Sequence, residues 1–458
     1  MSYRVVVIVI GAISIINLSG CSKEWTNHKY DQSQTVPDSV SDAQYLLNNS
    51  NIFDNGTSMG EIGAGDLYTT YANWQATYTN TERNCYIWAP DIYQGETGFD
   101  WDEAYQQIFT ANVALELLAS ISHGANSSNW NNVEGEALFF RGAAFYDLSQ
   151  LFCKAYDSLS AGTDLGIPLR LKSDVKATSV RSTVKATYEE ILADLTQSAS
   201  LLSATIPAGP LKTLPSKAAA FGVLARVYLN MENYAKASLY ADSCLKIQNY
   251  LLDYNTLDST QQFPLAQFND EVVFYREMGG GYALINSYEY LLVDSSLYLS
   301  YSSDDLRHVI YFKPNSPYYT FYGGEASIDG NLFGGIKTDE MFLIRAECNA
   351  RAGNIAAAMS DLNTVIASRY RTGTFTPYSA TGSADALQKV LTECRKELCF
   401  RDLRWSYLRR LNKDPDFAIT LTHYLNGNTY TLPPNSDLYI MPIAQDELQI
   451  SHIQQNTR

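Results

Sequence analysis

The pattern of apolar and polar residues predicts paired helices over much of the chain. Apolar residues recur at helical spacing in four segments, at residues 100–153, 216–247, 339–368 and 385–412. Turn-forming residues interrupt the first three, as at Gly353-Asn354, so that each of these reads as two helices joined by a short connection. We therefore expect a mainly α fold built from helical hairpins.

Two of these hairpins carry small residues where their helices would meet. Ala225 and Ala237 occupy such positions in 216–247, and Ala346 and Ala358 occupy them in 339–368. The spacing matches the tetratricopeptide pattern, in which stacked helical pairs share a core. The units are not contiguous, which excludes an uninterrupted solenoid.

Residues 51–100 and 250–335 have a different character, rich in Tyr, Ser, Gly and Asn. Each segment is too long for a structureless loop of a compact domain unless it is functional. We expect irregular insertions with short strands, packed on the helices.

The N-terminus has the pattern of a targeting segment. Arg4 precedes an apolar run at 5–16 that is too short to span a bilayer, and Leu-Ser-Gly-Cys at 18–21 resembles a bacterial lipobox. We expect residues 1–20 to be a lipoprotein signal peptide, Cys21 to be lipidated, 21–41 to be a flexible tether and 42–458 to be a single domain. The alternative is an ordinary secretory signal that contains a cysteine.

Charge changes the picture little. A formal net charge of −16 argues against non-specific nucleic-acid binding, which needs a basic face. Yet residues 393–411 concentrate arginine and lysine between apolar seams. We interpret this stretch as the continuation of a buried helix with paired arginines, in which Glu397 pairs with Arg401 one turn on. The helical cysteines are expected to be small buried apolar residues, with no disulfide framework.

The same stretch carries a resemblance. It is similar to the signature E-R-R-x-E-L-x-F-E-G-x-R-W-x-D-L-R-R of the SusD/RagB family, surface nutrient-binding lipoproteins of Bacteroidetes. The matching residues are Glu393, Arg395, Glu397, Leu398, Phe400, Arg404, Trp405, Leu408, Arg409 and Arg410, and the sequence departs at Cys394, Arg401, Asp402 and Tyr407. Six further segments resemble family elements in the family's order, at residues 136–152, 166–171, 181–195, 216–229, 441–451 and 454–456.

The resemblance implies tetratricopeptide-like hairpins packed against an irregular, ligand-binding half. It also implies a protein anchored by lipid to the outer membrane, facing the cell exterior, that captures oligosaccharides for a SusC-like TonB-dependent transporter. Peptide or glycopeptide cargo in the same role is an alternative, and a surface polysaccharide hydrolase with an unrecognised carboxylate pair is a further one.

Enzyme motifs are weak. The GTSMG segment at 56–60 matches GxSxG around Ser58, but it lacks the strand before it and the helix after it that a nucleophile elbow requires. No metal-ligand spacing or nucleotide-binding loop is present, so we expect no catalytic residues, no metal and no cofactor.

Binding chemistry is better supported, because aromatic rings stack on the apolar faces of sugars while polar side chains bond their hydroxyl groups. Two aromatic clusters in the loop-rich segments qualify. The predicted ligand-binding residues are Trp74, Tyr78, Arg83, Trp88, Tyr93, Tyr282, Tyr288, Tyr290, Tyr318, Tyr319 and Tyr322.

Overall fold

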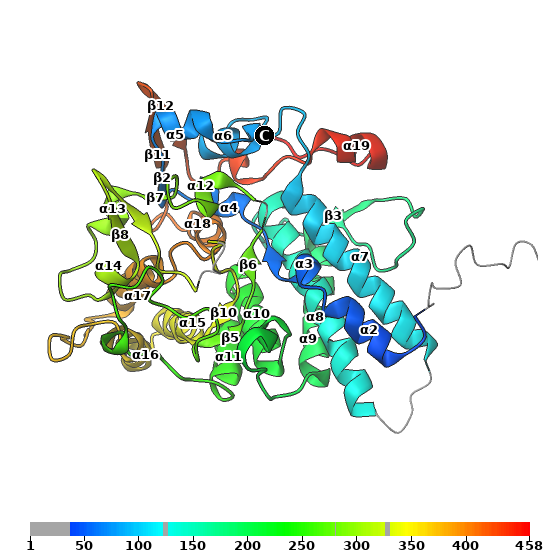
Figure 1. Cartoon of the computed structure of the whole chain (residues 1–458), viewed down its shortest axis with the longest axis horizontal. Helices are drawn as coiled ribbons and strands as arrows, with labels where there is room; N and C mark the ends of the chain where they lie inside the picture. The colour runs from blue at the N-terminus through cyan, green and yellow to red at the C-terminus, as the bar shows by residue number, and fades with distance from the viewer. Residues whose placement is uncertain (1–36, 122–126, 280, 326–329) are drawn as a thin grey trace, which may run out of the picture. The chain divides into compact units, whose positions relative to one another are not determined.

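Figure 1 shows the computed structural model of the chain, which describes residues 37–121, 127–279, 281–325 and 330–458. Ser39–Arg458 form one compact unit. The predicted signal peptide at 1–20, the lipidation site Cys21 and the tether up to residue 36 lie outside the described residues.

The first half of the unit is built from long helices that pack in chain order. α7 (Phe99–Ser120) packs on α8 (Ser127–Phe152), α8 on α9 (Val184–Leu201), and α2 (Val40–Leu47) on α7 and α8. Side chains fix the starts of these helices: Ser39 and Asp42 form a capping box on α2, and the Thr183 hydroxyl accepts from the third residue of α9.

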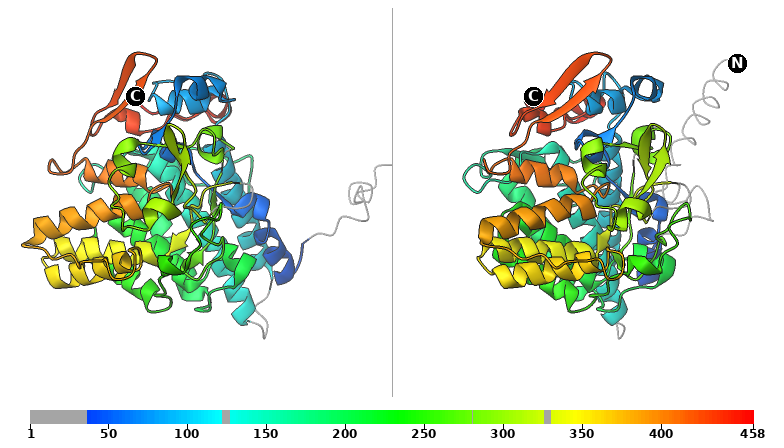
Figure 2. Two further views of the ribbon diagram at one scale, coloured as in Figure 1. Left: turned by 60° about the vertical axis from the view of Figure 1, so that its left-hand side comes forward. Right: turned by 90° about the vertical axis from the view of Figure 1, so that its left-hand side faces the viewer.

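Two hairpins continue this packing, and the predicted mainly α, hairpin-based fold class is confirmed. α10 (Lys217–Asn230) pairs with α11 (Tyr234–Leu245), and α15 (Thr338–Arg351) pairs with α16 (Ile355–Ala367). α11 packs on α15 although about a hundred residues separate them in the chain, and Figure 2 shows these helices side by side. Ala225 and Ala237 are fully buried, as close approach of two helices requires.

The loop-rich segments form short strands and short helices. A four-stranded sheet runs in the order β2 (Leu67–Tyr68), β7 (Leu292–Val293), β9 (Tyr318–Phe321), β8 (Phe312–Asn315), and all its pairings are antiparallel. The sheet therefore joins the two aromatic segments that lie far apart in the sequence. The short helices here are α3 (Ser50–Phe53), α4 (Met59–Gly63), α5 (Tyr71–Ala76), α6 (Asn80–Tyr86), α12 (Ala283–Asn286), α13 (Ser295–Tyr298) and α14 (Arg307–Ile310).

Four two-stranded pairs complete the strands. They are β1 (Asn55–Gly56) with β6 (Glu277–Met278), β3 (Leu165–Pro168) with β4 (Arg181–Thr183), β5 (Val272–Phe274) with β10 (Ile336–Lys337), and β11 (Leu421–Leu425) with β12 (Asn428–Leu432). The β11–β12 turn is Asn426-Gly427, with both residues at positive φ, as a two-residue hairpin turn favours. Short 3₁₀ turns lie at Gly209–Thr213, Tyr254–Thr256 and Asp437–Tyr439, and α19 spans Gln445–Ser451.

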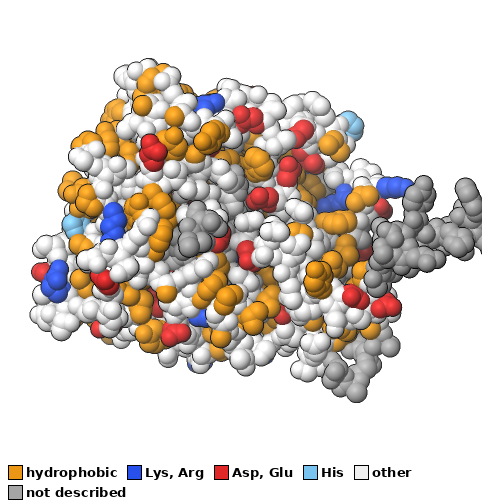
Figure 3. Space-filling view, in the orientation of Figure 1, with side chains coloured by type: hydrophobic (Ala, Val, Ile, Leu, Met, Phe, Trp, Pro, Cys, Tyr) orange, Lys and Arg blue, Asp and Glu red, His pale blue; other side chains and the backbone are white. Residues whose placement is uncertain are grey.

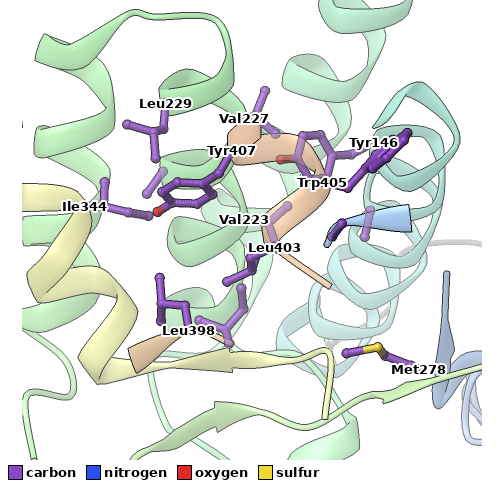
Figure 4. Close-up of a cluster of buried hydrophobic side chains, with 14 of the residues drawn as sticks. Tyr146, Val223, Val227, Leu229, Met278, Ile344, Leu398, Leu403, Trp405 and Tyr407 are labelled. Carbon is purple, nitrogen blue, oxygen red and sulfur yellow. The ribbon is translucent and has the colours of Figure 1, made fainter. Parts of the chain in front are cut away.

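The basic stretch differs from its prediction. α17 (Ser383–Glu397) ends, and a separate α18 (Arg404–Leu411) begins, because Phe400 and Asp402 both adopt positive φ of 56° and break the helix. A non-helical loop therefore begins after Glu397, so Arg401 does not lie one helical turn from it. Arg401 pairs with Asp339 at 2.9 Å instead. The predicted Glu397–Arg401 pair is wrong. The expected burial is correct, and Figure 4 shows Trp405 and Tyr407 of α18 inserted among Tyr146, Val227 and Ile344.

The arginines and lysines around α17 belong to a buried network, which we call the ionic cluster. Its side chains are each 6% exposed or less, and each forms an ion pair within 4.0 Å. They are Arg307, Lys337, Arg369, Lys396 and Arg401 with Glu271, Asp305, Glu325, Asp339, Glu393 and Glu397.

Candidate functional site

Three of the predicted ligand-binding rings are buried and anchor loops. Trp88 is 3% exposed, donates from its ring nitrogen to the Gly63 carbonyl at 3.0 Å and stacks on His423. Tyr93 is 2% exposed, and Tyr282 is fully buried beside Asp100. These rings present no face to a ligand, so the structure corrects the prediction at these three positions.

A second group of rings lies half-buried on α5. The Thr70 hydroxyl caps α5, and the helix places Tyr71 and Trp74 three residues apart on one side. Their rings are stacked, with centroids 5.8 Å apart and planes 20° apart. The Trp74 ring nitrogen donates to the Arg83 carbonyl at 2.9 Å, and Gln75 donates to the Tyr71 hydroxyl at 2.8 Å. Both rings are therefore held in place while part of each stays in solvent.

The sheet supplies four more half-buried rings on one of its faces. Alternation along β9 puts Tyr318 and Thr320 on the same face, and Tyr322 follows them. Tyr318 contacts Tyr68 of β2 with ring centroids 5.1 Å apart, and Tyr322 stacks on Tyr288 at 4.2 Å and 10°. The Thr320 hydroxyl donates to the Tyr288 carbonyl at 2.9 Å, which ties the second pair to the sheet.

The two groups of rings adjoin each other. Asn73 of α5 donates to the Glu289 carbonyl at 3.2 Å, and the β2–β7 pairing brings the segment before α5 against the segment after Tyr288. We name this set the aromatic face: Tyr68, Tyr71, Trp74, Tyr288, Tyr318 and Tyr322.

Two polar atoms beside the aromatic face are enclosed without a partner. The Tyr288 hydroxyl and the side-chain amide oxygen of Asn286 are buried and have no hydrogen-bond partner within the part of the chain that the structure describes. Burial, together with the neighbouring Tyr318 hydroxyl, raises the pKa of Tyr68 to about 12, and burial raises the pKa values of Tyr288 and Tyr322. These hydroxyls are therefore neutral at physiological pH.

Gly330 shapes this surface by lying against the ring of Tyr288. A Cβ atom there would come within 3.2 Å of the ring, and the residue has φ +88°. Only glycine adopts that conformation without strain, and its missing side chain leaves the ring in its stacked position.

The remaining predicted residues lie around the aromatic face or behind it. Tyr78 is 87% exposed just after α5. Arg83 is half-buried and bonds Thr77 and Asn80, which makes it a support for α5. Tyr319 stacks on Tyr298 at 3.7 Å from the other face of the sheet, and Tyr290 packs against the core.

Two residues of the aromatic face were missed from the sequence. Tyr71 precedes Trp74 by three residues, a spacing that shares one helix face, so the pattern YANW carried a usable signal. The sequence around Tyr68 carried no such signal, because the position of this ring depends on pairing with a strand more than two hundred residues later.

Other candidate chemistry is accounted for. Ser58 is fully buried, and its hydroxyl donates to the Gly279 carbonyl at 2.5 Å. The two-residue β1 precedes Ser58 and the short α4 follows it, so the expectation that the motif lacks a strand and a helix is wrong. The Ser58 hydroxyl is nevertheless enclosed and bonded to a carbonyl, whereas a nucleophile elbow exposes its serine. Among the described residues, no group of His, Cys, Asp and Glu side chains is placed to hold a metal ion. None of the described helices is long and apolar enough to cross a membrane.

Comparison with protein families gives two matches in chain order. Residues 24–229 match the family described as "Starch-binding associating with outer membrane", a SusD-like group, and residues 336–457 match the "SusD family". The chain belongs to the SusD/RagB family. The comparison with curated proteins gave no match.

Solved SusD-type structures share the fold over nearly the whole chain. A SusD superfamily protein from Bacteroides thetaiotaomicron has a TM-score of 0.74 at 22% identity, covering 92% of this chain and 100% of its own. A putative sugar binding protein from Bacteroides vulgatus has a TM-score of 0.73 at 22% identity, covering 92% and 99%. The surface glycan-binding protein A from Bacteroides uniformis has a TM-score of 0.70 at 17% identity, covering 91% and 98%.

In this SusD/RagB chain the signature stretch is structural. Glu393 and Glu397 bind Arg307 at 2.6 and 2.9 Å, and Arg410 binds Glu347 at 2.5 Å. Trp405 is 2% exposed against the α4 glycines. The signature therefore marks the scaffold, and the aromatic face lies on other segments.

Proposed function

We propose that this protein is a non-catalytic glycan-binding protein of the cell surface. The observation that carries the proposal is the aromatic face, whose six half-buried rings come from two distant segments. Ring faces held by neighbouring side chains lose little conformational entropy when a sugar stacks on them.

The family supports the carbohydrate assignment. One family match is described as starch-binding, and two structural relatives are described as sugar-binding and glycan-binding proteins. Membership of the family also supports the lipid anchor at Cys21, the outer-membrane location facing the exterior and delivery of bound oligosaccharide to a SusC-like TonB-dependent transporter. These last three remain part of the proposal.

A panel titration tests it. The chain from residue 22 onward keeps the compact unit Ser39–Arg458 whole and is suited to calorimetry against plant, host and microbial polysaccharides. We expect saturable binding to one glycan class with no release of shorter products. Absence of binding to every glycan would contradict the proposal, and product release would identify a hydrolase instead.

A further inference from the structure

A small enclosed cavity of about 20 Å³ lies where the helices meet the loop-rich segments. α8, α10 and the segment that runs from the end of α17 into α18 surround it, together with residues next to β1, β6 and β10. None of its lining residues belongs to the aromatic face. A space of this size has room for one atom of about the size of a water molecule and for no larger group.

The residues that line this cavity have hydrogen-bond donors to spare. Their buried side-chain nitrogens without a hydrogen-bond partner in the described part of the chain are Nε of Arg276, Nε and Nη2 of Arg401, and Nε1 of Trp405. Arg276, Arg401 and Trp405 are only 7%, 4% and 2% exposed. No buried side-chain oxygen of the lining lacks a partner in the same part of the chain. Because an unpartnered buried donor is costly, the lining favours a guest that accepts hydrogen bonds.

The carboxylates of the lining already have donors. Both oxygens of Asp147 accept from Arg276, at 2.6 and 3.3 Å, and Oδ2 of Asp402 accepts from the Thr57 hydroxyl at 2.8 Å. A water molecule would bring further donor hydrogens into this lining. A halide ion brings none and can accept from several donors at once, so the hydrogen-bonding groups favour a halide.

The guanidinium groups around the cavity share their carboxylates. Arg226 binds Glu340 at 2.5 Å, and Arg401 lies 3.7 Å from the same carboxylate. Asp339 binds Arg401 at 2.9 Å and also lies 3.4 Å from Lys337. One more negative charge can therefore be accommodated among these cations.

The cation at position 401 is a departure from the SusD/RagB signature. Arg401 stands where the signature has glutamate, so this chain places a positive charge where the signature has a negative one. Asp402 stands where the signature has glycine. Burial, followed by the neighbouring Asp147, raises the pKa of Asp402 well above its usual range, which favours the uncharged carboxyl. The two departures together leave the lining more positive.

The molecular surface does not supply the attraction for an anion. The chain has a formal net charge of −16, and Figure 3 shows Asp and Glu side chains spread over one face with few Lys and Arg among them. An anion therefore has to be held by local donors against the overall field. An enclosed site suits this task, because a hydrogen bond to a charged group is stronger away from water.

We propose that this cavity holds a chloride ion, bound by the guanidinium groups of Arg276 and Arg401 and by the indole N–H of Trp405. The ion supplies the missing acceptor and ties the segment between α17 and α18 to the neighbouring β6 segment. The size of the cavity excludes sulfate, phosphate and organic anions. The inference goes beyond the glycan proposal and does not rest on it.

Crystals of the chain from residue 22 onward, grown in bromide, give the most direct test. Bromide takes the place of chloride and can be located by its anomalous scattering. We expect an anomalous peak inside the cavity, within hydrogen-bonding distance of Trp405 Nε1 and Arg401. Water density there without an anomalous peak would overturn the inference, because the guest would then be a neutral molecule.

Unfolding at constant ionic strength, with gluconate replaced stepwise by chloride, tests the site in solution. An ion that binds only the folded state stabilises it according to the ratio of its concentration to its dissociation constant. We expect the unfolding midpoint to rise with chloride and to saturate. A midpoint that does not depend on chloride would also overturn the inference.

Trp405→Phe removes one donor and keeps an aromatic ring in the core. The apparent dissociation constant for chloride should rise roughly ten-fold, the effect of losing one hydrogen bond to a charged group. Trp88→Phe is the matched control, since Trp88 is also buried but donates to the Gly63 carbonyl and does not line the cavity. It should lower the midpoint in every buffer and keep the wild-type chloride dependence.

An unchanged chloride dependence in Trp405→Phe would contradict the assignment, because the ion would then bind elsewhere. Glycan affinity of the wild type should be the same in chloride and in gluconate. The two tests can therefore fail independently of each other.

Discussion

The ionic cluster and the aromatic face differ in which side chains they bury: the first buries charged groups, and the second leaves aromatic rings partly exposed. In the ionic cluster, charged side chains that normally seek water are fully buried, and each is balanced by a partner. In the aromatic face, aromatic rings remain partly exposed to solvent, held by stacking on neighbouring rings and, for Trp74, by a hydrogen bond to the Arg83 carbonyl. Buried charge is tolerated only where pairing offsets desolvation, whereas exposed rings gain nothing for folding. The first region serves the scaffold, and the second is free to serve a ligand.

The largest expected effect is on the ionic cluster. Arg307 is fully buried and binds Asp305, Glu393 and Glu397, so Arg307→Met leaves buried carboxylates without their counter-charge. We expect the free energy of unfolding in denaturant to fall by about 3–5 kcal/mol.

Arg371 provides the matched control. It is 57% exposed and lies 4.0 Å from Asp304, so Arg371→Met should change the free energy of unfolding by less than about 1 kcal/mol. Equal losses in the two variants would remove the distinction between buried and surface ion pairs.

A buried anchoring ring and a ring of the aromatic face should respond differently to truncation. Trp88→Ala removes a buried ring and should lower the free energy of unfolding by about 3–5 kcal/mol. Tyr71→Ala, on the aromatic face, should lower it by less than about 1 kcal/mol while weakening glycan binding. A large loss of stability in Tyr71→Ala would show that this ring is an anchor as well.

His423 gives a pH dependence in the anchoring region. It lies between the rings of Tyr86 and Trp88, with its Nδ1 2.8 Å from the Tyr86 carbonyl, and burial lowers its pKa to about 4. The unfolded chain has a histidine pKa near 6.5, so the unfolded state takes up the proton first. The stability from the neutral ring is complete above about pH 6.5 and is lost as the pH falls toward 4, by up to about 3 kcal/mol.

The imidazole signal of His423 in a nuclear magnetic resonance titration measures this directly, with an expected midpoint near pH 4. His423→Phe should lose less stability than the wild type between pH 7 and pH 4.5. A midpoint near 6.5 would mean that the ring is solvated and that the anchor is weaker than the structure indicates.

A smaller effect concerns one hydroxyl. Tyr288→Phe keeps the ring stacked on Tyr322 but removes the unpartnered hydroxyl. Because that hydroxyl is buried, we expect glycan affinity to change by less than about two-fold, with an unfolding midpoint that is unchanged or slightly raised. A fall in affinity of about ten-fold would contradict recognition by ring stacking, because the hydroxyl would then bond the ligand.

The sequence predicted the hairpins well because their apolar periodicity is local. It predicted the ligand surface less well because exposure is decided by distant segments. Trp88 and Trp74 lie in one aromatic-rich stretch, yet one is closed in by His423 and Gly63 and the other is not. Likewise, the positive φ values of Phe400 and Asp402 break a helix that the periodicity of the stretch continues.

The central claim is that the aromatic face binds glycan. It is tested most directly by calorimetry of Trp74→Ala and Tyr288→Ala with the glycan that the wild type binds, beside Tyr45→Ala, an 80% exposed ring on α2. We predict roughly ten-fold weaker binding in the first two variants, wild-type binding in the third and similar unfolding midpoints in all. Wild-type affinity in Trp74→Ala and Tyr288→Ala would contradict the account.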